Sequence, residues 1–113
     1  MKSYRIRYTW PARDDLRLIT AQIAMYSTGS ADNIRKRIIE KVRELAMFPN
    51  RGKSVALLGL RYFDQRFVAE GKYYIFFRVE QDQVIVTRIQ HSARDFANLQ
   101  LNLASESFED QDL

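Results

Sequence analysis

The sequence predicts a single α+β domain in which a helical hairpin covers one face of an antiparallel sheet. Three observations lead to this fold class: an alternating run near the N-terminus, two following stretches with helical periodicity, and three strand-like runs joined by short turns. The chain has 113 residues, of which 46% are hydrophobic and 12% aromatic, and this is enough for one core. We expect one domain over residues 1–103 and a flexible acidic tail over residues 104–113.

The first half of the chain predicts one strand and two helices. Residues 3–9 alternate between polar and apolar side chains, which is the period of a half-buried strand. A helix is expected from about Pro11 to Tyr26, because proline is favoured in the first turn and apolar residues then recur at helical spacing. Ser30 is the expected N-cap of a second helix, which ends before Pro49. The short connection makes the two helices an antiparallel hairpin.

The second half predicts three antiparallel strands. Strand-like runs cover residues 60–68, 73–80 and 84–91. The two segments that join them, residues 69–72 and 81–83, have the length of hairpin turns. The element order is therefore β-α-α-β-β-β. Both helices are expected on one face of the sheet, because the hairpin has an apolar side that a sheet must cover.

One face of the predicted sheet has no helix to cover it. The middle strand is apolar on both sides until Arg78, and a strand of this kind needs cover on both faces. The uncovered face would expose an apolar patch with a basic rim, formed by Tyr74, Phe76, Val84, Val86, Arg78 and Arg88. Monomers seldom expose such a patch, so we expect a protein partner. The alternative is that sheet curvature or the segment after Asp95 covers this face.

The charge of the chain is divided unevenly. Of its 14 acidic residues, four lie in the last nine positions, which contain no base, so residues 1–104 hold 18 basic against 10 acidic groups. A basic body attracts nucleic acid or an acidic protein segment, although a high isoelectric point is also common in soluble domains without such a role.

Several classes of function find no support in the composition. The chain contains no cysteine and one histidine, so we expect neither a metal site nor a cofactor. No apolar run is long enough for a membrane span or for the core of a signal peptide, and we expect a cytoplasmic protein.

Five segments of the sequence, in their order and spacing, resemble the RelE/ParE superfamily of bacterial toxin–antitoxin systems. These segments are Pro11–Leu16 with Ile19 and Tyr26, Leu45–Gly52, Gly59–Arg61, Tyr73–Val79 and Ile89–Asp95. Two features are similar to the ParE branch, namely the ending His91-x-x-Arg94-Asp95 and the turn Phe48-Pro49-x-x-Gly52. The resemblance implies a type II toxin, of the kind used in plasmid stabilisation, that inhibits DNA gyrase, blocks replication and is neutralised by a cognate antitoxin.

The resemblance also implies sites for both partners. An acidic, initially flexible antitoxin segment would fold onto the uncovered apolar patch and place its carboxylates against Arg78 and Arg88, forming a hetero-oligomer. Gyrase would be contacted through Arg61, His91 and Arg94, and direct contact with nucleic acid would be secondary.

Two alternatives come from the same superfamily. A RelE-like, ribosome-dependent mRNA interferase would need a general base, a general acid and cations at the phosphate, which His91, Arg94 and Arg61 would supply. We favour a non-enzymatic inhibitor, because a lone histidine at a strand end is usually structural and neither a tyrosine nor a histidine follows Arg94 before the acidic tail. We expect His91, Arg94 and Asp95 to form a local network instead. The second alternative is a non-toxic relic that still binds antitoxin.

Overall fold

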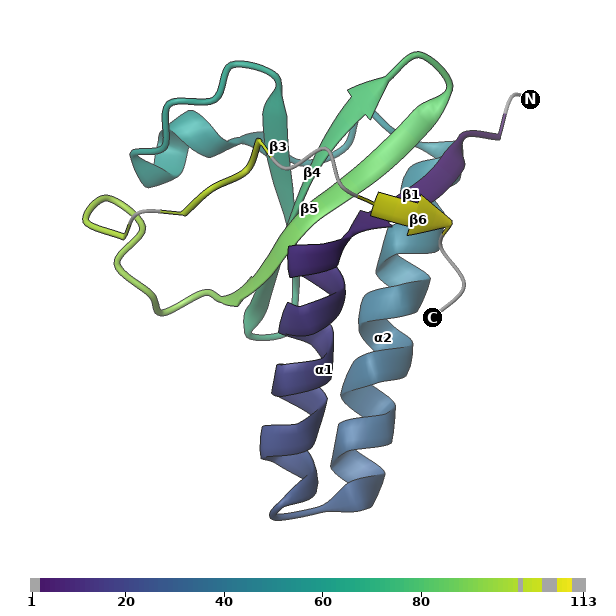
Figure 1. Cartoon of the computed structure of the whole chain (residues 1–113), viewed down its shortest axis with the longest axis vertical. Helices are drawn as coiled ribbons and strands as arrows, with labels where there is room; N and C mark the ends of the chain where they lie inside the picture. Colours follow the sequence, from purple (N-terminus) through teal and green to yellow (C-terminus); the bar gives the residue numbers. More distant parts are fainter. Residues whose placement is uncertain (1–2, 100, 105–107, 111–113) are drawn as a thin grey trace.

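The computed structural model describes residues 3–99, 101–104 and 108–110, and it has the predicted α+β class. In chain order the elements are β1 (Arg5–Thr9), α1 (Trp10–Ala24), α2 (Thr28–Met47), β2 (Lys53–Ser54), the 3-10 helix η1 (Val55–Leu58), β3 (Gln65–Glu70), β4 (Tyr73–Glu80), β5 (Gln83–His91) and β6 (Phe108–Asp110). Figure 1 shows the two helices side by side, running away from the sheet toward their connection.

The six strands form one mixed sheet in the order β2-β3-β4-β5-β1-β6. The predicted meander is confirmed, since β3, β4 and β5 pair antiparallel with their neighbours. β1 pairs with β5 in the parallel direction, and the short β6 pairs antiparallel with β1 (Figure 1). The strand predicted over residues 60–68 begins later, at Gln65, because Gly59, with a positive φ of 81°, caps the C-terminus of η1 and a loop follows.

Both helices begin at a side-chain cap. The Thr9 hydroxyl accepts a hydrogen bond from the Ala12 backbone N–H at 3.2 Å, and Pro11 lies in the first turn as expected. The second cap is Ser27 rather than the predicted Ser30, because its extended backbone lets its hydroxyl accept from the Ser30 N–H at 3.1 Å. The second helix therefore begins earlier than the sequence predicts.

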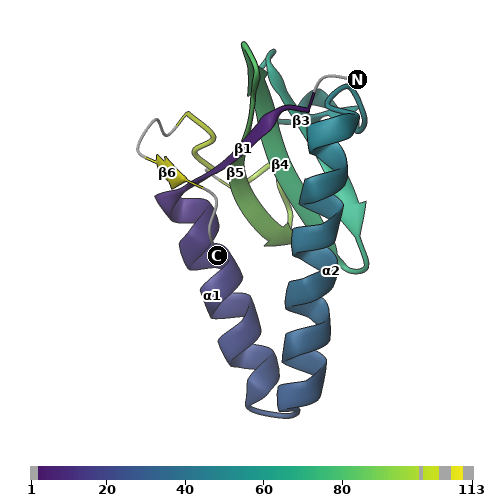
Figure 2. The same ribbon diagram turned by 90° about the vertical axis from the view of Figure 1, so that its right-hand side faces the viewer.

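The connection between the helices projects beyond the sheet. Figure 2 shows α1 and α2 diverging from this connection, with the strands at the wide end of the hairpin. Met25 and Tyr26 at the connection are therefore 81% and 92% exposed, although the helical periodicity had included Tyr26 in the apolar stripe. The described part of the chain has no helix whose length and hydrophobicity suit a membrane crossing.

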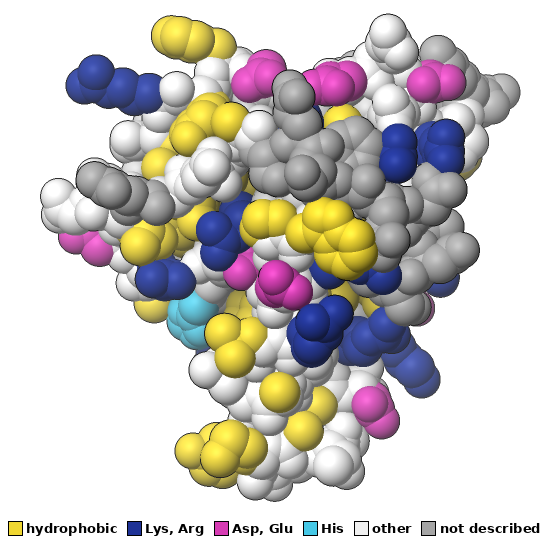
Figure 3. Space-filling model, viewed as in Figure 1, with side chains coloured by type: hydrophobic (Ala, Val, Ile, Leu, Met, Phe, Trp, Pro, Cys, Tyr) yellow, Lys and Arg dark blue, Asp and Glu magenta, His cyan; other side chains and the backbone are white. Residues whose placement is uncertain are grey.

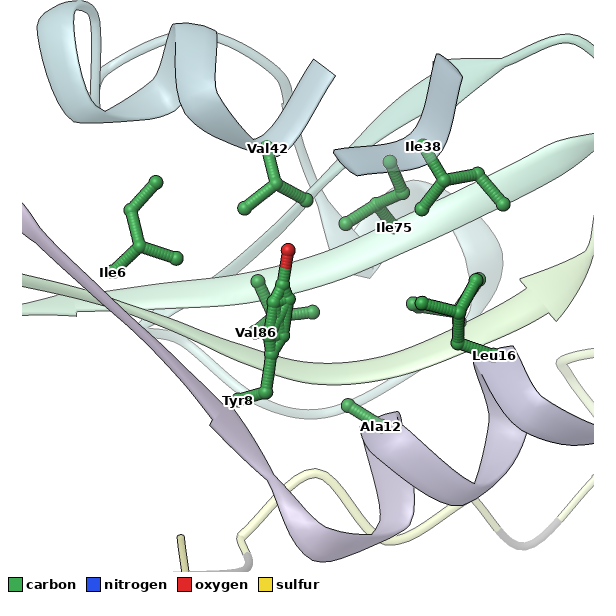
Figure 4. Packing of buried hydrophobic residues seen from close by; sticks show 9 residues of the cluster. Ile6, Tyr8, Ala12, Leu16, Ile38, Val42, Ile75 and Val86 are labelled. Atoms are coloured by element: carbon green, nitrogen blue, oxygen red, sulfur yellow. The ribbon is translucent and has the colours of Figure 1, made fainter. Parts of the chain in front are cut away.

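The face of the sheet that the helices cover, here called the helix face, holds two packed clusters. In the larger one, Ile38 and Val42 of α2 and Leu16 of α1 pack on the strands, and the Tyr8 oxygen points toward Val42 (Figure 4). The sheet side of this cluster consists of Ile6, Tyr8, Ile75, Val86 and Ile89. The smaller cluster consists of Leu45, Phe77 and Val84.

The opposite face is covered by the chain's own C-terminal segment, residues 96–99 and 101–103, here called the strap. The strap packs buried apolar side chains against Phe67 and Phe76 of the sheet and against Val55 of η1. Its buried residues are Phe96, Leu101 and Leu103. The alternative prediction, that the segment after Asp95 covers this face, is therefore confirmed.

The prediction of an exposed apolar patch is wrong for the chain on its own. Phe76, Val84 and Val86 are fully buried, and Arg78 is 4% exposed. The strap covers Phe76, whereas Val84 and Val86 lie on the helix face. Val84 and Val86 lie on the helix face because of a β-bulge. The register of β4 and β5 shifts between Phe76 and Phe77, so that Val86 stands opposite Phe77.

Hydrogen bonds hold the end of the strap on the sheet. The Leu103 carbonyl accepts from Gln65 Nε2 at 3.1 Å and from Arg78 Nη1 at 3.3 Å. The Thr87 hydroxyl donates to Gln65 Oε1 at 3.2 Å, and Arg78 Nε donates to Glu80 Oε1 at 2.8 Å. Arg78, which we expected at the rim of an exposed patch, is therefore part of a satisfied polar network beneath the strap.

Candidate functional site

A half-open groove of about 350 Å³ lies between α1 and the ends of β4 and β5. Its lining residues are Asp15, Leu18, Ile19 and Gln22 of α1, with Tyr73, Arg88, Ile89, Gln90, His91 and Arg94 on the other side. The groove brings together Arg88, His91 and Arg94, all three of which the sequence had singled out. Figure 3 shows the single histidine, in cyan, at the surface beside a basic side chain.

An ion pair ties the two walls of the groove together. The Asp15 carboxylate on α1 accepts hydrogen bonds from Arg88 Nε at 2.6 Å and Nη2 at 2.8 Å, and from the Ile89 backbone N–H at 2.9 Å. The side chains of Asp15 and Arg88 are 11% and 23% exposed, so solvent screens this pair only partly. The register of β4 and β5 places Arg88 opposite Phe76, on the face away from the helices as predicted, but its side chain reaches the α1 carboxylate of Asp15.

His91 lies at the end of β5, where its ring is held by two contacts. Its Nδ1 accepts a hydrogen bond from the Ala93 backbone N–H at 3.0 Å, and the ring meets Tyr73 edge-on with centroids 5.5 Å apart. A nitrogen that accepts this bond has no proton, so the neutral ring carries its proton on Nε2. In this arrangement the exposed nitrogen of His91 is a donor, and the ring stabilises the turn after β5.

Arg94 extends the basic end of the groove. Its Nη1 donates a hydrogen bond to Gln90 Oε1, and its backbone N–H donates to the His91 carbonyl at 3.3 Å. The Asp95 carboxylate accepts from Asn98 Nδ2 at 2.7 Å, and no ion pair joins it to Arg94 among the described residues. The side chains of His91, Arg94 and Asp95 therefore each have a separate local partner, namely the Ala93 amide, Gln90 and Asn98, in place of the expected network.

Arg61 is not part of the groove. It is exposed in the loop between η1 and β3, and no acidic residue in the described ranges, Asp64 included, forms an ion pair with it. The three residues predicted to contact the target are therefore divided between the groove, which contains His91 and Arg94, and a separate loop.

Sequence reasoning missed the α1 wall of the groove. Leu18 is 59% exposed, and Gln22 follows it one helical turn later on the same side of α1. The sequence did contain a signal for this wall, because Leu18 is an apolar residue outside the buried stripe of the helix, which contains Ala12 and Leu16.

A second hollow, of about 220 Å³, is basic and lies between the two helices. Its lining residues are Arg13, Leu16, Arg17, Thr20 and Arg35. Arginines of this region also act on the buried Tyr8 hydroxyl. Burial raises the pKa of Tyr8 well above its usual value, and the positive charges of Arg43, Arg35 and Arg13 lower that pKa in part.

The groove has the features of a binding site rather than of a metal centre. Among the residues that the structure describes, no three histidine, aspartate or glutamate side chains gather in a way that could hold a metal ion. Its one carboxylate, Asp15, is occupied by Arg88 and the Ile89 amide. The groove offers apolar contact along α1 and hydrogen-bond donors from the turn after β5.

Comparisons with known proteins identify the family. The family described as "ParE toxin of type II toxin-antitoxin system, parDE" matches residues 6–96. A solved structure of the chromosomal ParDE system from P. aeruginosa is similar with a TM-score of 0.66 at 18% identity, covering 79% of this chain and 96% of that one. The RelBE2 toxin–antitoxin complex from Mycobacterium tuberculosis is similar with a TM-score of 0.59 at 24% identity, covering 84% and 95% respectively.

These solved structures support the fold, and the family match covers more than half of the chain. The comparison with curated protein sequences gives no match. The resemblance seen in the sequence is confirmed: the chain belongs to the ParE toxin family of type II toxin–antitoxin systems, within the RelE/ParE superfamily.

Proposed function

We propose that this protein is a cytoplasmic toxin that inhibits DNA gyrase without enzymatic chemistry of its own, and that a cognate acidic antitoxin neutralises it. The observation that carries the proposal is the family match over residues 6–96, which includes both walls of the groove. The excess of basic residues outside the tail supports a macromolecular target or partner of opposite charge.

The geometry of the groove favours binding over acid–base catalysis. A general base needs a free acceptor atom within reach of the proton that it removes. His91 Nδ1 is bonded to the Ala93 amide, the Asp15 carboxylate is bonded to Arg88, and the chain has no second histidine. These contacts support a protein inhibitor over an mRNA interferase.

The groove is also the surface that best fits an antitoxin segment. Leu18 and Tyr73 offer apolar contact, and Arg94 offers a cation at one end, a combination that suits an amphipathic acidic segment. The antitoxin-binding role predicted for Tyr74, Phe76, Arg78, Val84, Val86 and Arg88 stays a prediction. For Val84 and Val86 that role would require the helices to leave the sheet.

A supercoiling assay tests the target. The purified chain, incubated with gyrase, ATP and plasmid, is expected to cause linear DNA to accumulate. Arg94→Ala and Arg61→Ala are each expected to weaken this effect at least tenfold, whereas Arg37→Ala, exposed on α2 outside both hollows, should leave it unchanged. Circular dichroism checks that each variant is folded.

Two outcomes would contradict the gyrase proposal. Cleavage of mRNA on ribosomes, with gyrase unaffected, would establish the interferase alternative. A chain that affects neither process but binds the product of an adjoining acidic reading frame would be the non-toxic alternative.

A further inference from the structure

The outer edge of β1 is occupied by the tail of the same chain. β6 pairs antiparallel with β1, placing Phe108 opposite Thr9, Glu109 opposite Tyr8 and Asp110 opposite Arg7. Figures 1 and 2 both show this short strand at the end of the sheet, next to the first turn of α1. Without β6, the backbone N–H and C=O groups on this side of β1 would form an open sheet edge.

The occupant and the edge have opposite charge. β6 contributes Glu109 and Asp110 from a tail without any base, and β1 contributes Arg5 and Arg7. Arg13 and Arg35, which line the hollow between the helices, act electrostatically on Tyr8 of β1. The edge is therefore a backbone pairing surface set in a basic surround, which favours acidic extended segments over neutral or basic ones.

β6 uses only part of this edge. β1 spans five residues, Arg5–Thr9, but β6 stands opposite the last three of them. A longer strand would pair with Arg5 and Ile6 as well. It would therefore form more backbone hydrogen bonds than β6 does, and main-chain hydrogen bonds are the source of affinity when a strand is added to a sheet edge.

The tail lies outside the part of the chain that defines the family. The family match ends at residue 96, which is the first residue of the strap, and does not include β6. The ParDE structure from P. aeruginosa is 96% covered while only 79% of this chain is, so this chain contains residues without a counterpart there. The edge strand β1 thus lies almost wholly within the family match, whereas its occupant β6 lies outside it.

We propose that the outer edge of β1 is an acceptor site for an extended acidic strand, that β6 occupies it in the free chain, and that a longer acidic strand of the antitoxin replaces β6 there. A tethered strand has an effective concentration in the millimolar range, so it excludes weak competitors. Only a segment that gains more contacts, or that is itself held nearby through the groove, displaces it. β6 thereby makes the edge selective and prevents two copies of the chain from pairing edge to edge.

Hydrogen exchange in the full chain tests the occupied edge. The variant Glu109→Lys/Asp110→Lys reverses the charges opposite β1, and Glu106→Lys/Asp112→Lys has the same net charge but leaves the β6 residues intact. Amides of β1 that point away from β5 are expected to exchange at least tenfold faster in the first variant and less than threefold faster in the second. Equal rates in all three proteins would overturn the proposal.

A peptide with the sequence of residues 105–113 tests the acceptor site itself. Added to the isotope-labelled Glu109→Lys/Asp110→Lys chain, it is expected to cause saturable shifts of β1 resonances with a millimolar dissociation constant. Binding to the unaltered chain should be at least tenfold weaker, because β6 competes. A peptide with its four acidic residues changed to amides should bind several-fold more weakly, and added salt should weaken binding of the acidic peptide.

Absence of shifts in β1, shifts spread over the helix arginines, or equal binding to both proteins would each refute an acceptor site at β1. The identity of the displacing strand rests on the proposed antitoxin partner, but neither experiment contains gyrase or antitoxin. A negative result in these two experiments would not contradict the proposed function, and a negative supercoiling assay would not contradict the acceptor site at β1.

Discussion

The two faces of the sheet are both buried, but by different kinds of structure. On the helix face, two helices with side-chain caps place regularly spaced apolar residues against β1, β4 and β5. On the opposite face, an irregular strap covers the strands and is fixed by a few side-chain hydrogen bonds to Leu103. The helices are regular secondary structure and lie within the family match, whereas the strap begins at residue 96, where that match ends.

This difference predicts different responses to perturbation. Removing a helix from the sheet exposes a large part of the core and requires global unfolding, because both helices share one hairpin. Among the described residues, the strap is bonded to the sheet through the side chains of Gln65 and Arg78 and through no backbone–backbone hydrogen bond, so we expect it to open locally. Variants on the two faces can establish whether this contrast is real.

The largest effect is expected on the helix face. Phe77→Ala removes a fully buried ring that packs with Leu45 and Val84, and it should lower the free energy of unfolding by about 3–5 kcal/mol. Urea denaturation followed by circular dichroism measures the change. A loss below about 1 kcal/mol would mean that this cluster is not part of the cooperative core.

A smaller effect is expected where α1 is tied to the sheet. Asp15→Asn leaves the partly buried Arg88 guanidinium without its carboxylate and should destabilise the fold by about 2–3 kcal/mol. The matched control is Asp14→Asn, because the pair that Asp14 forms with Arg17 is exposed and should contribute less than about 0.5 kcal/mol. Equal losses in the two variants would remove the distinction between the two ion pairs.

The strap should respond mainly through local opening. Phe96→Ala removes a ring that is 4% exposed, nearly as buried as Phe77, yet it should lower global stability by only about 1–2 kcal/mol. Limited proteolysis within the strap should at the same time become at least tenfold faster than in Phe77→Ala under native conditions. If Phe96→Ala instead destabilised the protein as much as Phe77→Ala, the strap would be an integral part of the core.

The smallest effect appears only at alkaline pH. Because burial raises the pKa of Tyr8, this group is neutral in the folded chain at pH values where the unfolded chain already loses the proton. Its stabilising influence is complete below pH 10 and is lost as the pH rises above that, by about 1 kcal/mol at pH 11. Tyr8→Phe should therefore lose less stability than the unaltered chain between pH 9 and 11 in parallel denaturant titrations.

Local patterns predicted the helix face well and the strap face poorly. Apolar residues at helical spacing and hairpin-length turns were sufficient for the hairpin and the meander. The orientation of Val86 was missed because a bulge in the middle of two apolar strands changes which residues share a face, and it leaves no mark in their composition. The strap has no periodicity, so Leu101 and Leu103 did not stand out as core residues.

The predicted residues that meet in the groove all come from the end of β5 and the turn after it. His91 and Arg94 lie close in sequence and meet in the groove. The opposite wall comes from α1, and the pairing of Asp15 with Arg88 spans most of the chain. A contact of this separation depends on how α1 is placed over β5, and the periodicity of either element does not contain that information.

The parallel pairing of β1 with β5 also constrains the order of folding. Residues 5–8 find their partners at residues 83–86, which a ribosome synthesises last among the strands that the family match includes. Until then, β1 can join neither the meander nor the groove wall that depends on β5, although the helical hairpin can already form from local contacts. A nascent or prematurely terminated chain therefore lacks the assembled groove, so the binding surface that we propose is complete only after this region has been synthesised.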